Sequence, residues 1–383
     1  MIRARTSGFL PLLLACSLNV AVARRVFSHV RAADGVRMCI TPGGAHPCDC
    51  VHDIPANSRV KRNLATTSTA ESNDVILPNG TVIHHPKCPH DTPSRPVPPM
   101  SSSLQHIGTT MKHTGDACAL IEAGGSGYYH GRPMNSYYIT DTGNFSRWNS
   151  TYSVPDTPAK TTSQTYLFYW IGLQDTRDAN GSPVLQPVLS YTGSGVPNIG
   201  EPSAWLLDKH GSREEVDAAV SWYFMSWNCC PAGHKYSAPY VDTTEGAEDL
   251  RGEVSCKNDG TCTVNSVNRN DQTSSMTLDN SNVGATSYNW AIVELETYYI
   301  DKCADYCSGT FGATAMSLYN SNGTEVSPTA PSAWTNNPYL QRTTASSPAL
   351  QTDNFTLCCE GKFQMGWPAQ YISQNLDFSS IKY

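Results

Sequence analysis

Nine short segments with the composition of β-strands follow one another between residues 166 and 318, and they constrain the fold more than any other feature. They are rich in Val, Ile, Thr, Tyr and Trp, with Asn, Asp and Gly between them. Only residues 212–219 have helical composition, and that segment is short. Many short strands at regular spacing predict an all-β fold, and we expect a two-sheet antiparallel β-sandwich of the concanavalin-like kind. The segments are 166–173, 183–190, 219–227, 236–241, 250–256, 261–267, 272–278, 290–300 and 311–318.

The N-terminus predicts export from the cell. Arg3 and Arg5 precede an apolar run from Phe9 to Ala23, and the run ends in Ala-Val-Ala, which is the pattern of a signal peptide (residues 1–23) cleaved after Ala23. The run is shorter than the ~20 apolar residues that a membrane-spanning helix needs. Fourteen cysteines are also many for a reducing cytosol. We expect a secreted, disulfide-stabilised protein without a membrane span.

A second processing site is predicted at Arg62. Residues 59–62 read Arg-Val-Lys-Arg, the R-x-K-R pattern that furin- and kexin-like convertases recognise. Cleavage there would separate residues 24–62, with seven basic and three acidic side chains, from a remainder with 17 basic and 30 acidic ones. Ten cysteines, an even number suited to pairing, would remain after residue 62. We expect residues 24–62 to be a basic propeptide that sits on its charge complement.

The remaining chain divides into a linker and a sandwich domain. Residues 63–114 lack apolar periodicity and are proline-rich, so we expect an extended linker or N-terminal extension. Residues 115–383 are assigned to the sandwich and its Cys-rich C-terminal extension. Four potential metal ligands lie in the linker, but its prolines and the lack of a distant second ligand pair favour a solvated segment, so we expect no metal and no cofactor. These ligands are His84, His85, Cys88 and His90.

Covalent features support a secreted chain. Cys256 and Cys262 flank a hairpin turn centred on Asn-Asp-Gly, so a disulfide between them can join the ends of two strands. Structural disulfides are more typical of a secreted chain than a redox or zinc role for its cysteines. Six Asn-x-Ser/Thr sequons predict a glycoprotein with these residues on the surface. The sequons are Asn79, Asn144, Asn149, Asn180, Asn322 and Asn354.

Charge excludes one class of partner. The formal net charge is −7, whereas a nucleic-acid-binding protein presents a basic face. No phosphate-binding G-K-[ST] loop and no G-x-S-x-G motif is found in the sequence either. We expect no nucleic-acid partner.

Two predicted strands carry polar side chains where core residues are expected. Gln186 shares a strand face with Val184 and Val188. Glu294 and Glu296 lie on one face of the strand over 290–300, about 6.5–7 Å apart. By periodicity alone these residues also fit the solvated face of a sheet. The pattern therefore names candidate residues and leaves two interpretations open.

The order of landmarks along the chain adds a resemblance to a known family. The chain resembles the eqolisins, the acid-active glutamic peptidases, which are two-sheet sandwiches made as secreted preproenzymes. The match covers about residues 148–300 and consists of short patterns in the family's order. The landmarks are Tyr152-Ser-Val-Pro155, Tyr169-Trp-Ile-Gly-Leu173, Val184-Leu-Gln186, Ser221-Trp-Tyr223 with Ser226-Trp227, and Ala291-Ile-Val-Glu294.

The resemblance implies roles for individual residues. Gln186 falls on the family's catalytic Gln and Glu294 on its catalytic Glu, while a slip of one residue pair would put Glu296 in that role. The resemblance also implies substrate contacts, at Trp170, Gln174, Trp222 and Trp227.

The sequence departs from the family pattern at three positions. Gln174 stands where the family has Asp, Ser226 where it has Glu, and Trp290 where it has the first Glu of the last motif. Residues 301–383 have no counterpart. The departures bear on catalytic competence more than on the fold.

The implied activity is acid-active endoproteolysis of polypeptides by a monomer. Near the reference pKa of Glu, about 4.3, a carboxylate can take a proton from water, and a Gln amide can stabilise the resulting oxyanion. The first alternative is a non-catalytic carbohydrate-binding or structural glycoprotein, in which sugar rings stack on Trp205, Trp222 or Trp227. A glycoside hydrolase using Glu294 and Glu296 ranks third, because two residues on one strand rarely flank a glycosidic bond.

Overall fold

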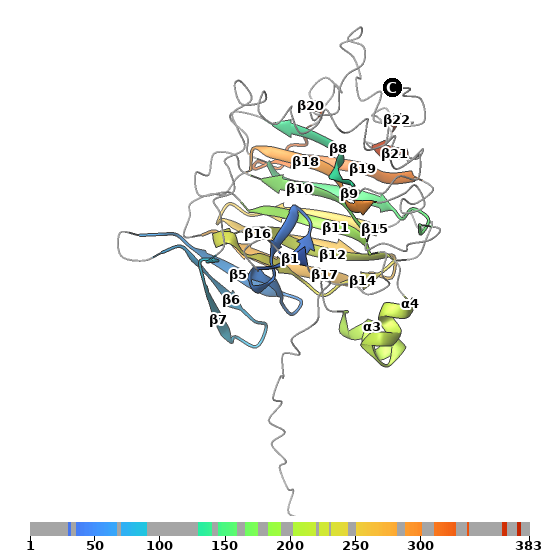
Figure 1. The fold of residues 1–383 in the computed structure, drawn as a ribbon. Helices are drawn as coiled ribbons and strands as arrows, with labels where there is room; N and C mark the ends of the chain where they lie inside the picture. Colours follow the sequence, from blue (N-terminus) through green and yellow to red (C-terminus); the bar gives the residue numbers. More distant parts are fainter. Residues whose placement is uncertain are drawn as a thin grey trace, which may run out of the picture.

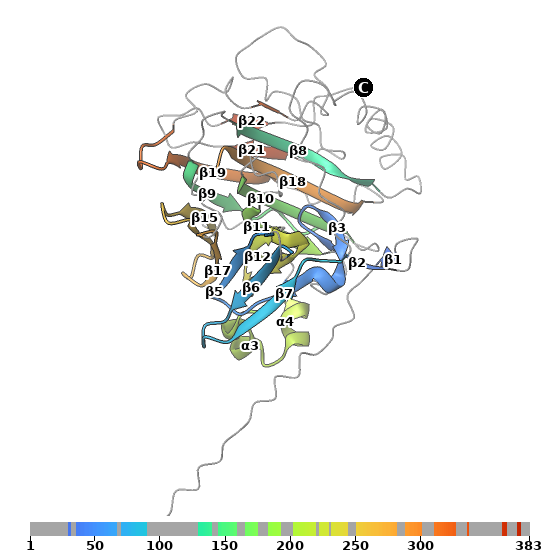
Figure 2. The same ribbon diagram turned by 90° about the vertical axis from the view of Figure 1, so that its left-hand side faces the viewer.

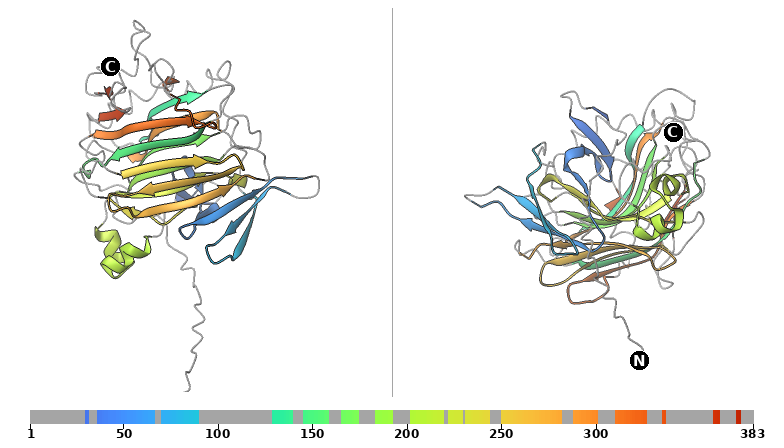
Figure 3. Two further views of the ribbon diagram at one scale, coloured as in Figure 1. Left: turned by 180° about the vertical axis from the view of Figure 1, so that it is seen from behind. Right: turned by 90° about the horizontal axis from the view of Figure 1, so that it is seen from below.

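In the computed structural model, the regular secondary structure of the described residues is almost all β-strand, with only short helices (Figure 1). The strands form a nine-stranded sheet, a ten-stranded sheet and a small three-stranded sheet. The two large sheets stack face to face, so the predicted all-β sandwich is confirmed (Figure 3). The structure describes residues 30–31, 36–66, 70–89, 129–139, 145–158, 165–174, 183–192, 202–219, 222–229, 231–243, 250–281, 288–300, 310–326, 335–336, 362–365 and 374–376.

The nine-stranded sheet contains the strands that carry the candidate catalytic residues. Its order is β20-β8-β18-β10-β11-β12-β13-β4, with β14 beside β12. Neighbours are antiparallel except β13 and β4, which are parallel. The strands are β20 (Thr335–Asn336), β8 (Tyr129–Ile139), β18 (Trp290–Ile300), β10 (Tyr166–Gln174), β11 (Val184–Thr192), β12 (Trp222–Cys229), β13 (Lys235–Ser237), β4 (Val51–Asp53) and β14 (Val241–Asp242).

The ten-stranded sheet forms the other layer. Its order is β22-β21-β19-β9-β15-β16-β17-β5-β6-β7, and only the β19–β21 and β17–β5 pairs are parallel. The strands are β22 (Gln374–Leu376), β21 (Lys362–Met365), β19 (Thr310–Asn320), β9 (Phe145–Ser153), β15 (Leu250–Cys256), β16 (Thr261–Val267), β17 (Thr273–Asp279), β5 (Ser58–Asn63), β6 (Ser72–Ile76) and β7 (Val82–Pro86).

Successive side chains of β10 point alternately into the core between the sheets and to the outer face of the nine-stranded sheet. Leu167, Tyr169, Ile171 and Leu173 all point into the core, while the intervening residues face the other side of the sheet. Tyr152 of β9 fixes the two layers to each other. Its hydroxyl donates to the Pro187 carbonyl (3.0 Å) and accepts from the Ile171 N–H (2.9 Å). The Tyr-Ser-Val-Pro landmark thus holds β10 and β11 in place.

The structure differs from the expected linker at residues 72–86. These residues form β6 and β7, which extend the ten-stranded sheet beyond β5 (Figure 2). The segment before Arg62 is likewise built into the sandwich, because β5 pairs with β17 and Val60 lies in the main core, fully buried. Periodicity does not predict this strand, because its buried side consists of Ser58, Val60 and Arg62, of which only Val60 is apolar.

Two short helices and a hairpin lie on the outer side of the nine-stranded sheet. Helix α4 (Arg213–Ala219) confirms the predicted helical segment, whereas α3 (Ala204–His210) begins after the N-cap Ser203 and ends before Gly211 at φ +86°. Strands β2 (Arg37–Thr41) and β3 (Gly44–Pro47) flank a Pro42-Gly43 turn, and β1 (Val30–Arg31) pairs with β2. Among the described residues no helix has the length and apolar character to span a membrane.

A buried ion pair holds the predicted cleavage site inside the sheet. Arg62 is 1% exposed, and its Nε donates to Oε1 of Glu71 at 3.0 Å. We expect Glu71→Ala to lower the free energy of unfolding by about 3–5 kcal/mol, because it removes the carboxylate that balances the buried arginine charge. Urea unfolding measures the loss. Exposed Glu214→Ala is the control and should change stability by less than about 0.5 kcal/mol. Equal losses in both variants would contradict the assignment.

Candidate functional site

The candidate site lies on the face of the nine-stranded sheet that points away from the ten-stranded sheet. A second buried cluster covers this face, with side chains from β10, β11, β12 and β18 below and from β2, α3 and α4 above. The cluster consists of Ile40, Tyr166, Phe168, Trp170, Val188, Leu206, Val216, Tyr223, Met225, Trp227, Tyr240 and Ile292.

Gln186 and Glu294 both lie on this face, on strands that flank β10. The register sets Glu294 opposite Trp170. Trp170 also opposes Val188 and Leu173 opposes Leu185, so Gln186 is level with Gly172. The two residues are therefore two strands apart across the sheet and two residues apart along the strand direction. This places their Cα atoms about 12 Å apart. Their side chains both project from this face, on the two strands that flank Gly172.

Glu296 is on the same face but one step further away. It lies opposite Phe168, so the same arithmetic gives about 17 Å between its Cα atom and that of Gln186. Gln186 and Glu294 are each 1% exposed and Glu296 is fully buried. The register therefore favours Glu294 over Glu296 as the partner of Gln186.

In the described part of the chain, three buried polar atoms without a hydrogen-bond partner belong to Gln186 and to two tryptophans on the same face. Among the described residues, Oε1 of Gln186 and the indole Nε1 atoms of Trp170 and Trp227 are buried and have no hydrogen-bond partner. Trp227 lies directly opposite Gln186 on β12. Each such atom costs about 1–3 kcal/mol of folding free energy, and such costs are typical of functional sites. This face therefore retains hydrogen-bonding capacity for a ligand.

Gly172 lets the Trp170 indole lie between the two candidate catalytic residues. A Cβ atom at Gly172 would come within 2.8 Å of Cζ3 of Trp170 and 3.1 Å of Cγ1 of Val184. The ring thus lies over the glycine, where any larger residue would displace it. Glycine is required here for close approach rather than for an unusual backbone angle.

We expect Gly172→Ala to move the Trp170 ring toward Gln186 and Glu294 while the sheet persists. Misplacement by about 1 Å can cost up to 10²-fold in rate, so kcat/KM for a peptide should fall by about tenfold or more. Gly80→Ala is the control, because Gly80 has open space around it, although its φ of +84° adds some backbone strain. Steady-state kinetics and the near-UV tryptophan signal measure the effect. An unchanged kcat/KM would show that the ring position is not critical.

A hairpin from the N-terminal segment lies against the site. The Gly43 N–H at the turn between β2 and β3 donates to Oε2 of Glu296 at 2.6 Å. The buried Lys235 ammonium donates to Oγ1 of Thr41 (2.7 Å) and to the Pro42 carbonyl (2.8 Å). Ile40 packs in the apolar cluster. Residues 40–43, here called the hairpin tip, therefore present peptide backbone to Glu296 and Lys235.

The predicted substrate-contact residues divide between the two faces. Trp170 and Trp227 lie on the candidate face, and Gln174 ends β10 opposite Trp290. The prediction for Trp222 is wrong, because it packs in the core between the sheets with Phe224. Along β12 the alternation gives Tyr223, Met225 and Trp227 to the candidate face and Trp222 and Phe224 to the core.

The carbohydrate-binding interpretation loses its main support. It requires exposed aromatic rings, but Trp222 and Trp227 are 1% and 0% exposed. The large exposed apolar residues in the described part of the chain are Val82, Ile83 and Leu207, none of them aromatic. The side chain of Trp205 lies outside what the structure describes. No described feature of this face favours stacking against sugars.

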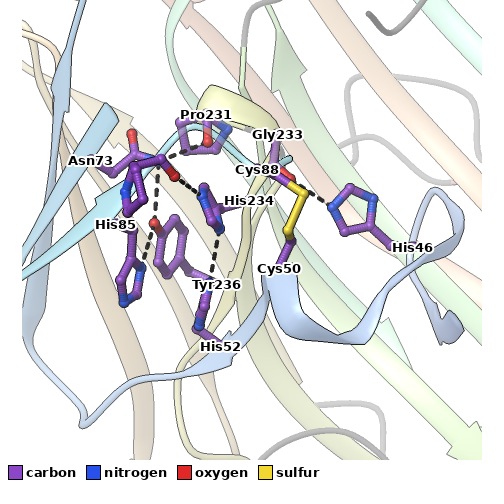
Figure 4. Close-up of a disulfide and its surroundings, with 11 residues drawn as sticks. His46, Cys50, His52, Asn73, His85, Cys88, Pro231, Gly233, His234 and Tyr236 are labelled. Carbon is purple, nitrogen blue, oxygen red and sulfur yellow. Dashed lines mark hydrogen bonds between the residues drawn. A yellow bond between two sulfur atoms is a disulfide. The ribbon is translucent and has the colours of Figure 1, made fainter. Parts of the chain in front are cut away.

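The processing and disulfide predictions have separate outcomes. The Cys256–Cys262 disulfide is confirmed and closes the β15–β16 hairpin. Ala23 lies outside the described residues, and cleavage after Arg62 stays a prediction. The structure adds Cys39–Cys48 within the N-terminal segment and Cys50–Cys88, which joins that segment to residues beyond Arg62 (Figure 4). Cys88 is thus a disulfide cysteine rather than a metal ligand.

The six sequons remain predictions. Asn79 and Asn322 are exposed, and Asn149 of β9 is partly exposed. Asn144, Asn180 and Asn354 lie outside the described residues.

Sequence reasoning missed the hairpin tip and Lys235. The Pro42-Gly43 dipeptide is a signal for a type II turn, with φ of +84° at Gly43, and predicts a hairpin. No local pattern predicts that this hairpin packs on a strand more than 180 residues away.

Comparisons with known proteins give structural neighbours only. No protein-family model matches the chain, and no curated protein sequence matches it. The solved structures that resemble it include scytalido-glutamic peptidase with a peptide-based transition-state analogue, at 15% identity and a TM-score of 0.33. That match covers 52% of this chain and 83% of the other. SCP-B, a member of the eqolisin family in complex with the tripeptide Ala-Ile-His, matches at 14% identity and a TM-score of 0.31, covering 52% and 82%. These values are too low to assign the chain to a family.

Proposed function

We propose that the chain is a secreted, acid-active endopeptidase of the glutamic type, with Gln186 and Glu294 as its catalytic pair. One observation carries the proposal. A buried amide and a buried carboxylate share one sheet face, two strands apart, on either side of Gly172. The ordered landmarks of the sequence support the same pair.

The chemistry follows from the two side chains. In acid, an ionised Glu294 takes a proton from a water molecule, and the water oxygen attacks the carbonyl carbon of the scissile peptide bond. Negative charge then develops on the carbonyl oxygen, and the Gln186 amide N–H donates a hydrogen bond to it. Glu294 returns the proton to the amine nitrogen as the C–N bond breaks. A neutral amide keeps its donor at any working pH, so only the carboxylate must be in the right protonation state.

The hairpin tip supports a peptide as the ligand. The face already accepts backbone, since the Gly43 N–H reaches Glu296 and the Pro42 carbonyl accepts from Lys235. A substrate must displace this hairpin, so the intact chain is proposed to be an inhibited precursor. The described disulfides are typical of an oxidising compartment, which fits secretion.

The test is an activity profile of the purified secreted protein on a denatured protein substrate between pH 2 and pH 7. Samples are prepared with and without co-expression of a furin-type convertase, so that cleavage can occur before folding is complete, and pepstatin and a metal chelator inhibit contaminating proteases. We expect cleavage that peaks in acid. A folded protein that cleaves nothing at any pH, in either form, would refute the proposal.

A further inference from the structure

Three histidines from distant segments meet beside the Cys50–Cys88 disulfide (Figure 4). His52 comes from β4, His85 from β7, and His234 from the turn between η2 (Pro231–Gly233) and β13. Their potential ligand nitrogens all lie within 4.8 Å of one another. The cluster is separate from the face that carries Gln186 and Glu294.

Hydrogen bonds orient the rings for a common ligand. Nε2 of His234 donates to the Pro86 carbonyl at 2.6 Å, so its Nδ1 carries a lone pair, and this atom lies 2.9 Å from Nε2 of His52. Nδ1 of His85 is hydrogen-bonded to the Tyr236 hydroxyl at 3.0 Å, which leaves Nε2 as its ligand atom. A backbone carbonyl or similar partner on the second ring nitrogen is the usual arrangement around metal-binding histidines.

The surroundings hold the three imidazole rings in place. The His52 and His85 rings are stacked with centroids 4.0 Å apart. The disulfide and the parallel pairing of His52 with Tyr236 fix the backbone on either side.

We propose that His52, His85 and His234 bind one divalent transition-metal ion of the Zn²⁺ class, with water in the fourth position. Three imidazole nitrogens suit zinc, with Zn–N distances of about 2.0–2.1 Å. The gap between His52 and His234 needs to open by only a few tenths of an ångström to accept the ion. His52 precedes the Arg62 site and the other two ligands follow it, so the ion also joins the N-terminal segment to the body of the protein.

The intact protein, freed of metal by dialysis against a chelator, tests the site. Isothermal titration with Zn²⁺ should show one equivalent bound, and Co²⁺ should give the intense visible bands of four-coordinate geometry. His85→Asn and His234→Asn should each weaken binding at least about tenfold. His84→Asn is the matched control, because His84 is adjacent on β7 and its exposed ring pairs with Asp74; it should bind like the natural chain.

Three results would overturn the proposal. They are no stoichiometric binding by the natural chain, the weak spectrum of six-coordinate Co²⁺, and equal losses in His84→Asn and His85→Asn. Circular dichroism checks the folding of each variant, and if one fails to fold, the Co²⁺ spectrum of the natural chain decides alone. The readouts do not involve peptidase activity, so the proposal stands or falls separately from the proposed function.

Discussion

Glu294→Gln is expected to abolish peptide cleavage while leaving the sandwich folded. The substitution keeps the shape of the side chain but removes the group that takes a proton from water. General acid–base catalysis contributes about 10²–10⁴-fold, so kcat should fall by about that factor. Gln186→Ala removes the oxyanion donor and should cost about 10²–10³-fold in kcat. Initial rates at the acid optimum, on chains that retain their circular dichroism spectrum, measure both effects.

Glu296→Gln is the matched control for this prediction. Glu296 is equally buried but lies one residue pair further from Gln186 and accepts its hydrogen bond from Gly43. It should retain most of the activity, and loss of this charged acceptor should loosen the hairpin tip. Inactivation by Glu296→Gln with activity kept in Glu294→Gln would move the catalytic role to Glu296. Activity in both variants would refute a glutamic mechanism.

Cleavage after Arg62 should leave the N-terminal segment attached to the protein. Cys50 precedes the cut and Cys88 follows it, so the disulfide holds the two pieces together. When the chain is co-expressed with a furin-type convertase, which can reach Arg62 before the sheet closes, we expect one species on a non-reducing gel and a separate N-terminal fragment on a reducing gel. Mass spectrometry of the two samples measures the same difference.

Two paired variants control this experiment. Cys50→Ser with Cys88→Ser should let the fragment separate without reductant under denaturing conditions. Cys39→Ser with Cys48→Ser removes a disulfide that lies wholly within the segment, so the fragment should stay attached. Release of the fragment from the natural chain on a non-reducing gel would show that the Cys50–Cys88 bond is absent.

A tethered segment has a consequence for inhibition. A short link keeps the hairpin tip at an effective concentration of the order of millimolar near its site. Cleavage should therefore relieve the inhibition only in part, so that the cleaved protein keeps some peptidase activity with the segment still attached. The count of ten remaining cysteines, which suggested a clean separation at Arg62, is misleading because one of the ten pairs with Cys50.

Local patterns predicted local structure well. The bounds of β15, β16 and β18 agree with the predicted segments, and the turn between Cys256 and Cys262 determines their pairing within a few residues. The alternation of side chains along each strand is enough to place Gln186 and Glu294 on the strand face opposite the one that packs in the main core. It did not assign Trp222, which was chosen as an aromatic residue near the landmark and not by its position relative to Gln186.

Distant contacts were beyond such patterns. His84, His85, Cys88 and His90 were judged as one local group, whereas His85 meets His52 and His234 from far away in the chain. Cys88 belongs to a disulfide and His84 to an ion pair with Asp74, so the local spacing grouped residues with unrelated roles. Arg62 fits a cleavage motif in the sequence, but in the structure it is buried in an ion pair with Glu71. No local pattern predicts this burial.

The pairing of β5 with β17 also determines when Arg62 is accessible. One edge of β5 pairs early with β6, but at the other edge Ser58 lies opposite Met276, so that edge stays open until more than two hundred further residues have been synthesised. Contacts of such sequence separation form late and slowly. Arg62 is therefore open to proteases in the nascent and partly folded chain and closes when the sheet is complete. Cleavage would then report on how long folding takes, and slower folding would yield more cleaved protein.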